Sequence, residues 1–197
     1  MKSKSAMDNN RLNIVDERGN VIGEETRQKI HRDGLLHRII HVWFYTPDKR
    51  IIFQVRGKDA ETNPNLFDAT VGGHVEIGQD YIQAAIAETC EETGIHVQSN
   101  ELQPLAIKKF GPTPDKITNT INHHLVALFA YLFRGEIKNL QAEKDEDGGI
   151  KFEAWPIEKI FSLTEEERKR FIPTQLKPDY LEIFRKIILL AGKTTIS

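Results

Sequence analysis

The sequence predicts a single α/β (α+β) domain, with a mixed β-sheet sandwiched between helices and extra helices at the C-terminus. Short runs rich in Ile, Val and aromatic residues, typical of strands, alternate along the chain with segments that carry helix-capping residues. The 197 residues contain no internal repeat and no linker long enough to separate two domains. We therefore expect residues 1–10, which are polar, to be a disordered N-terminal segment and residues 11–197 to form the domain.

Each element follows from a local pattern of apolar residues, glycines and prolines. A hairpin is expected around Gly19, a short helix is expected to end at Gly34, and the C-terminal helix has a proline near its first position. The expected strands are residues 12–15, 21–22, 35–45, 51–56, 66–71, 103–110, 123–134 and 150–155. The expected helices are residues 26–33, 80–92, 157–163, 165–171 and 178–190, and the expected loops include residues 58–65, 111–115 and 140–149.

Composition and charge narrow the classes of function. Hydrophobic residues make up 39% of the chain and charged residues 28%, which excludes a disordered protein. With 27 basic and 29 acidic residues, the net charge of −2 argues against a protein that binds nucleic-acid polymers or anionic membranes. A protein that binds a small phosphorylated ligand needs only a few cations, so the net charge does not argue against this class of function. The single cysteine, Cys90, allows no intramolecular disulfide, and without a signal peptide or membrane span we expect a cytoplasmic protein.

Residues 80–92 form the clearest predicted helix. Asp80 is a favourable N-cap, Gln83 completes a capping-box pattern, and Gly94 fits the position just after the helix. Immediately before the helix, Gly72 and Gly73 allow the backbone to approach a metal or a phosphate closely.

Three carboxylates share one stripe of this helix. Glu88, Glu91 and Glu92 lie on the same face because residues three and four apart are neighbours on a helix. They repel one another, and the helix dipole disfavours acids near a C-terminus, so the stripe predicts a compensating cation. Oxygen ligands favour Mg²⁺, with Mn²⁺ as an alternative. A solvated charged face is the other reading of the same pattern.

Residues 73–95 resemble the 23-residue signature of the Nudix hydrolases, which is Gly-x5-Glu-x7-Arg-Glu-aliphatic-x-Glu-Glu-x-Gly-aliphatic. The segment reads GHVEIGQDYIQAAIAETCEETGI and aligns without a gap. It departs from the signature at three positions, Gln79, Ala87 and Thr89. In the family the missing Glu and Arg mainly support the loop and helix, so these departures bear on catalytic efficiency and not on the fold.

The resemblance implies a Mg²⁺-dependent hydrolase that cleaves a diphosphate linkage in a small phosphorylated substrate. By motif position, Glu88 and Glu92 are expected metal ligands, and Glu91 is a third or water-mediated ligand. The backbone carbonyl of Gly72 or Gly73 would complete part of the shell. Glu88 is the preferred general base, and Glu91 is the other expected catalytic residue. The expected substrate contacts are Arg56, Gly73 and His74.

Residues 13–95, about half the chain, also resemble the Nudix subfamily related to isopentenyl-diphosphate isomerase. This resemblance is carried by VDERGNVIG (residues 15–23), KIHRDGLLHR (residues 29–38) and FDATVGGH (residues 67–74). In those isomerases the histidines equivalent to His31, His37 and His74 bind a metal. The alternative is that His37 bonds to backbone and His31 lies on a helix surface. Gly72 stands where the isomerases have a cysteine, so proton chemistry at carbon lacks a partner and hydrolysis is favoured.

Several further residues are candidates for secondary roles. Arg56 would contact phosphate or be an exposed residue at a strand end. The acids of residues 143–147 and Glu153 are candidates for an additional metal-binding carboxylate. His123 and His124 are adjacent in a strand, so at most one of them faces the site. The apolar stripe of the last helix either packs on the sheet or meets a partner, so the protein is a monomer or a homodimer.

Three functions are compatible with these observations. The first is hydrolysis of a nucleoside diphosphate linked to a further group, or of a similar small phosphorylated molecule, with Mg²⁺. The alternatives are an enzyme like isopentenyl-diphosphate isomerase and a non-catalytic binder of a phosphorylated ligand.

Overall fold

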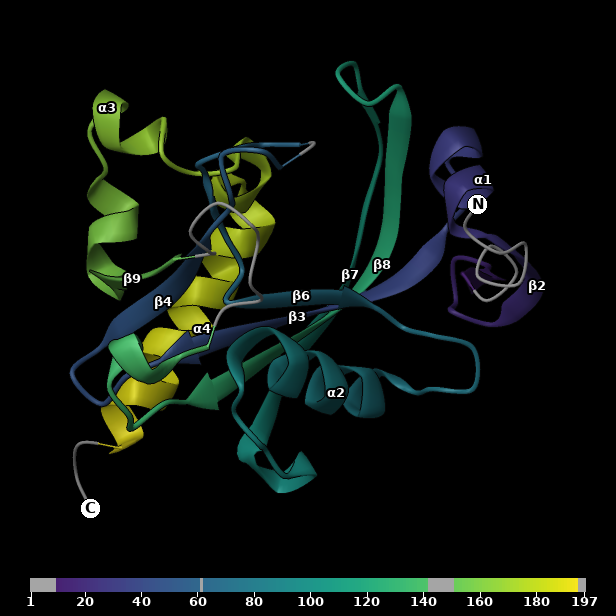
Figure 1. Ribbon diagram of the computed structural model, residues 1–197. Coiled ribbons are helices and arrows are strands. Elements are labelled where there is room, and N and C mark those ends of the chain that lie inside the picture. Colours follow the sequence, from purple (N-terminus) through teal and green to yellow (C-terminus); the bar gives the residue numbers. More distant parts are fainter. Residues whose placement is uncertain (1–9, 61, 142–150, 195–197) are drawn as a thin grey trace.

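Strand β3 (His37–Tyr45) lies at the centre of a mixed sheet in the computed structural model, which describes residues 10–60, 62–141 and 151–194 (Figure 1). On one side β3 pairs in parallel with β8 (Thr120–Leu132) along its whole length. On the other side it pairs antiparallel with β6 (Val71–His74) and then with β4 (Arg50–Val55). The other strands are β1 (Arg11–Val15), β2 (Val21–Thr26), β5 (Phe67–Asp68), β7 (Leu102–Asp115) and β9 (Lys151–Pro156).

Helices cover both faces of this sheet, as the sequence predicts. Side chains alternate along β3, so Trp43 packs with α4 (Pro178–Thr194) while Val42 packs in the core that includes α2 (Tyr81–Thr93). The other helices are α1 (Arg27–Asp33) and α3 (Glu165–Arg168), with the 3-10 helices η1 (Ser99–Glu101), η2 (Ile137–Asn139), η3 (Ile157–Ser162) and η4 (Pro173–Leu176). The single α+β domain with a curled mixed sheet confirms the predicted fold class.

The capping residues define α1 and α2 as expected. Asp80 accepts a hydrogen bond from the backbone N–H of Gln83, whose side chain returns one to the N–H of Asp80. Gly94 ends α2 in the left-handed conformation at φ +71°. Gly34 ends α1 in the same way at φ +66°.

The prediction of a loop at residues 111–115 is wrong. These residues belong to β7, which continues to Asp115 and pairs with β8 to form a long two-stranded arm beside α1 (Figure 1). The register shifts between Phe110 and Thr113, so Gly111 and Pro112 are accommodated in a β-bulge. The sequence signal for a turn was therefore real, but pairing with β8 overrides it.

Two predicted C-terminal helices are shorter or of another type. Residues 157–162 form the 3-10 helix η3, and the helix expected at residues 165–171 ends at Arg168. In α4 the buried side chains Tyr180, Ile183, Phe184 and Ile187 pack against the sheet, which confirms the intramolecular alternative for the apolar stripe. No helix among the described residues is long and apolar enough to span a membrane. The predicted disordered segment, apart from Asn10, and the acids of residues 143–147 lie outside the described residues.

Candidate functional site

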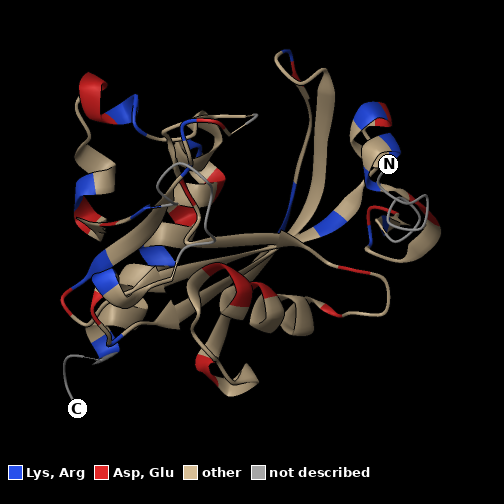
Figure 2. Ribbon diagram, viewed as in Figure 1, with Lys and Arg blue, Asp and Glu red and all other residues tan. Residues whose placement is uncertain are grey.

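The carboxylates of α2 lie against the backbone of β6. A Cβ atom placed on Gly73 would overlap the carboxylate of Glu88, so this glycine lets the helix approach the strand closely. Figure 2 shows acidic segments on α2 beneath β6, and α2 carries no Lys or Arg. The absence of a side chain at Gly73 therefore allows the acidic helix to lie directly against the strand.

The neighbouring glycine contacts the next carboxylate along the stripe. The backbone N–H of Gly72 donates to Oε2 of Glu92 at 3.2 Å. In an antiparallel ladder the N–H and C=O of one residue point the same way, so the carbonyl of Gly72 also faces the edge of β6 where Glu92 lies. A carbonyl and carboxylates at one edge are a suitable donor set for a hard divalent cation.

The remaining positions of the signature segment are more exposed or have other partners. Glu91 is exposed on the last turn of α2, whereas Glu88 and Glu92 are half-buried. Gln79, at the position of the signature glutamate, accepts a hydrogen bond from the N–H of Glu76 at 3.1 Å and so still closes the loop before α2. The carboxylates of Glu88, Glu91 and Glu92 do not meet as a three-ligand set in the described part of the chain.

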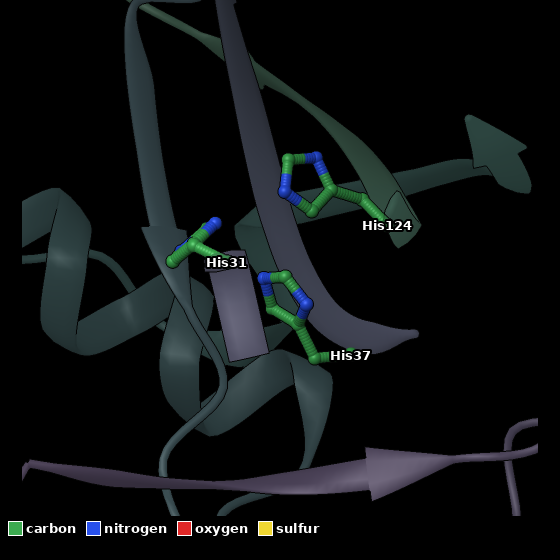
Figure 3. Close-up of side chains that lie close together, drawn as sticks. All are labelled: His31, His37 and His124. Atoms are coloured by element: carbon green, nitrogen blue, oxygen red, sulfur yellow. The ribbon is translucent and has the colours of Figure 1, made fainter. Parts of the chain in front are cut away.

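A cluster of histidines lies where α1, β3, β6 and β8 meet. Donor atoms of His31, His37 and His124 all lie within 4.8 Å of one another, and Figure 3 shows the three rings turned toward a common centre. His74 joins them, with its Nε2 3.2 Å from the Nε2 of His31 and its ring stacked on that of His37 at 5.3 Å. The convergence of His31, His37 and His74 is as the isomerase resemblance implies.

His124 is the member of the cluster that the sequence did not single out. The parallel pairing of β3 with β8 places it beside His37, at a ring-centroid distance of 4.7 Å. His123 faces elsewhere and donates from Nδ1 to the carbonyl of Gly34 at 3.0 Å. The expectation that at most one of the pair faces the site is confirmed. Which of the two it is could be decided only from the pairing register of β3 and β8.

The cluster offers neutral nitrogen atoms. His37 donates from Nδ1 to the carbonyl of Leu35 at 2.9 Å, which leaves the lone pair on Nε2. The Nε2 atoms of His37 and His124 are buried without a hydrogen-bond partner among the described residues. Burial lowers the pKa of His37 to about 4 and those of His74 and His124 to about 2, and it lowers the pKa of His31 as well. Unpaired, neutral imidazole nitrogens fit a borderline divalent cation such as Zn²⁺.

Two other candidates are engaged in contacts within the protein. Arg56 donates to Oδ2 of Asp68 at 2.9 Å and to both oxygens of Thr62. Glu153 accepts from the indole N–H of Trp155 at 2.7 Å and pairs with Arg170 at 2.6 Å. An open, apolar depression of about 300 Å³ between Tyr81 and strands β7 and β8 is lined by none of the candidate residues.

Comparisons with known proteins identify the family to which the chain is similar. Residues 35–175 match the family model described as NUDIX domain. An uncharacterized Nudix hydrolase of Clostridium acetobutylicum is 30% identical over 142 residues, which are 71% of this chain and 67% of that protein. The isopentenyl-diphosphate Delta-isomerase of Serratia proteamaculans is 26% identical over 118 residues, which are 60% of this chain and 65% of that protein. The matches thus span about two thirds of the length of these two relatives.

The fold recurs among solved structures. The crystal structure of a Deinococcus radiodurans protein superimposes with a TM-score of 0.61 at 19% sequence identity, covering 89% of this chain and 98% of that chain.

Proposed function

Because the chain belongs to the Nudix hydrolase family, we propose that it cleaves a diphosphate linkage with Mg²⁺ or Mn²⁺ as the metal. The proposed substrate is a nucleoside diphosphate linked to a further group, or a similar small phosphorylated molecule. The observation that supports this most directly is the approach of α2 to β6, where Gly73 fits against Glu88 and the N–H of Gly72 binds Glu92.

The proposed roles follow from the positions of these residues in the signature segment. Glu88, Glu91, Glu92 and the carbonyl of Gly72 would hold the metal, which neutralises charge on phosphoryl oxygens and lowers the pKa of a bound water. Glu88 is the proposed general base, with Glu91 as the alternative. Gly73 and His74 are proposed substrate contacts. Arg56 is the third, although its guanidinium already binds Asp68 and Thr62.

Substitution of one carboxylate tests the proposal. Release of phosphate or nucleotide is measured from nucleoside di- and triphosphates, ADP-ribose, dinucleoside polyphosphates and isopentenyl diphosphate, each with Mg²⁺, with Mn²⁺ and with chelator. We expect metal-dependent release that Glu92→Gln lowers about 10²-fold or more, because a ligand charge is lost at the metal. Glu158→Gln, an exposed glutamate on η3, is the matched control and should leave turnover unchanged. Equal turnover in Glu92→Gln and the control would contradict the proposal.

The histidine cluster favours a second metal centre, separate from the carboxylates. We propose that His31, His37 and His124 hold a nitrogen-liganded divalent cation such as Zn²⁺, because their donor atoms lie within 4.8 Å of one another and the Nε2 atoms of His37 and His124 have no hydrogen-bond partner in the described structure. Zn²⁺ should bind the metal-free protein in calorimetric titration, and His124→Asn should weaken binding about 10-fold or more. His96→Asn, which changes an exposed histidine outside the cluster, should bind as the unchanged protein does.

The same cluster keeps the isomerase alternative testable. Conversion of isopentenyl diphosphate to its isomer in the substrate panel would establish that alternative, against the expectation from Gly72 at the cysteine position. The third reading, a non-catalytic binder, would show thermal stabilisation by a phosphorylated ligand without metal-dependent turnover.

A further inference from the structure

His41 lies on β3 opposite Gly72 of β6, the residue whose amide contacts Glu92. The two residues are partners in the antiparallel ladder, so both point to the face of the sheet that α4 covers. A Cβ atom on Gly72 would lie 3.3 Å from Cδ2 of His41 and 3.6 Å from its Nε2. The Nε2 edge of the imidazole therefore faces the α-carbon of Gly72, where no side chain intervenes.

Aromatic neighbours hold this imidazole in place. The hydroxyl of Tyr180, on α4, lies 3.0 Å from Nδ1 of His41, and the two rings stack at 6.1 Å. Trp43 contacts the imidazole edge-to-face at 6.2 Å, and Phe110 of the β7–β8 arm stacks on Tyr180 at 4.8 Å. Contacts from β3, β7 and α4 thus fix one orientation of the ring.

The hydrogen bond from Tyr180 also determines which nitrogen carries the proton. A phenol is a stronger acid than the N–H of a neutral imidazole, so the favoured arrangement has the hydroxyl donating to Nδ1. Burial raises the pKa of Tyr180, so its hydroxyl keeps the proton that it donates. The nearby carboxylate of Asp68 is bound by Arg56 at 2.9 Å. With Nδ1 as the acceptor, the proton of the neutral ring lies on Nε2, toward Gly72.

We propose that the Nε2–H of His41 donates a hydrogen bond to a phosphoryl oxygen of a diphosphate bound beside Gly72. This inference rests on the proposed function, because it takes the diphosphate to bind at the edge of β6 where Glu92 contacts the amide of Gly72 at 3.2 Å. The glycine leaves the space between that edge and the imidazole free of a side chain. A fixed, neutral donor stabilises charge that builds up on a phosphoryl oxygen and leaves activation of water to the carboxylates.

Substitutions at His41 and Tyr180 test this role in turnover. His41→Leu should lower kcat about 10²-fold with little change in KM, as for loss of one donor to a transition-state oxygen. His41→Gln retains an N–H donor and should recover most of the loss. Tyr180→Phe removes the hydroxyl that donates to Nδ1, so the imidazole can adopt either tautomer, and kcat should fall about two- to ten-fold. Tyr131→Phe, a half-buried tyrosine in the core on the α2 side, is the control. Equal losses in His41→Leu and His41→Gln would reveal a merely structural role and overturn the inference.

A nuclear magnetic resonance experiment tests the donor without relying on turnover. In ¹⁵N-histidine-labelled protein, the His41 signals are assigned by their absence in His41→Gln. We expect a neutral ring protonated on Nε2, and a shift of this N–H when pyrophosphate and Mg²⁺ are added together. A proton on Nδ1 would overturn the inference even in an active hydrolase. The expected tautomer and shift in a protein that turns over no substrate would support the donor and contradict the proposed hydrolysis instead.

Discussion

At Gly73, a missing side chain and a carboxylate depend on each other. The hydrogen atom that a side chain would replace faces Glu88, and a methyl group there would occupy the position of the carboxylate. Neighbouring Gly72 contacts Glu92 through its amide at the edge of β6, and its α-carbon lies beside His41 on the face that α4 covers. Two adjacent residues without side chains thus shape the space around the proposed metal.

The substitution Gly73→Ala tests this dependence. The added methyl group would displace Glu88, so metal-dependent turnover should fall about 10-fold or more, as expected when a catalytic group moves by about 1 Å. Kinetics at several Mg²⁺ concentrations would measure the loss. Gly192→Ala is the control, because a Cβ there meets no atom within 4 Å, and it should stabilise α4 by about 0.5–1 kcal/mol without changing turnover. Unchanged turnover in Gly73→Ala would contradict the role of Glu88.

Individual residues also show where prediction from sequence stopped. Glu88, Glu91 and Glu92 were identifiable because helical periodicity is local and the capping residues fix the helix around them. His124 and His41 were not, because their neighbours His37, Gly72 and Tyr180 lie on other elements. Only the strand register and the docking of α4 bring these side chains together.

At the scale of the element, α2 carries its own boundary information. Its capping box is local in sequence, which explains why both ends of the helix could be predicted. The β7–β8 arm is the opposite case, since the turn residues Gly111 and Pro112 lie in a bulge that only the partner strand can accommodate. The sequence predicts the bounds of an element correctly where its own residues make the hydrogen bonds. The prediction fails where a strand distant in sequence supplies them.

The capping box predicts the outcome of a substitution at Asp80. Asp80→Ala removes the acceptor for the N–H of Gln83 and should lower the free energy of unfolding by about 1 kcal/mol, measured by urea denaturation. Asp80→Asn retains a capping oxygen and should lie within a few tenths of a kcal/mol of the unchanged protein. If the two variants were equally destabilised, the cap would not be the source of the loss.

At the scale of the whole molecule, the histidine cluster makes stability depend on pH. The folded-state pKa values of about 4 for His37 and about 2 for His74 and His124 lie below the ordinary value of 6.5. The unfolded chain therefore binds more protons below pH 6.5, and the folded state loses stability as pH falls. The free energy of unfolding is not reduced by these histidines above pH 6.5, and it falls as the pH is lowered from 6.5 toward their folded-state pKa values.

This dependence is measurable in metal-free protein. The free energy of unfolding should fall by about 1.4 kcal/mol per pH unit for each cluster histidine once the pH is well below 6.5. Urea denaturation at pH 7 and at pH 5.5 measures it, and His124→Asn should reduce the slope. A free energy of unfolding that is the same at both pH values would contradict burial of neutral imidazoles in the cluster.

The parallel ladder between β3 and β8 has a consequence for how the proposed metal would enter the cluster. His37 and His124 stand on strands that are separated in sequence by α2 and four other strands, so the cluster assembles only after a large loop has closed. A zinc finger draws its ligands from a short segment and folds around its ion. Here the ion would bind only after this loop has closed, which is the slow step of folding. Zn²⁺ should therefore leave the refolding rate unchanged and slow unfolding, because a bound ion stabilises only a structure that has already formed.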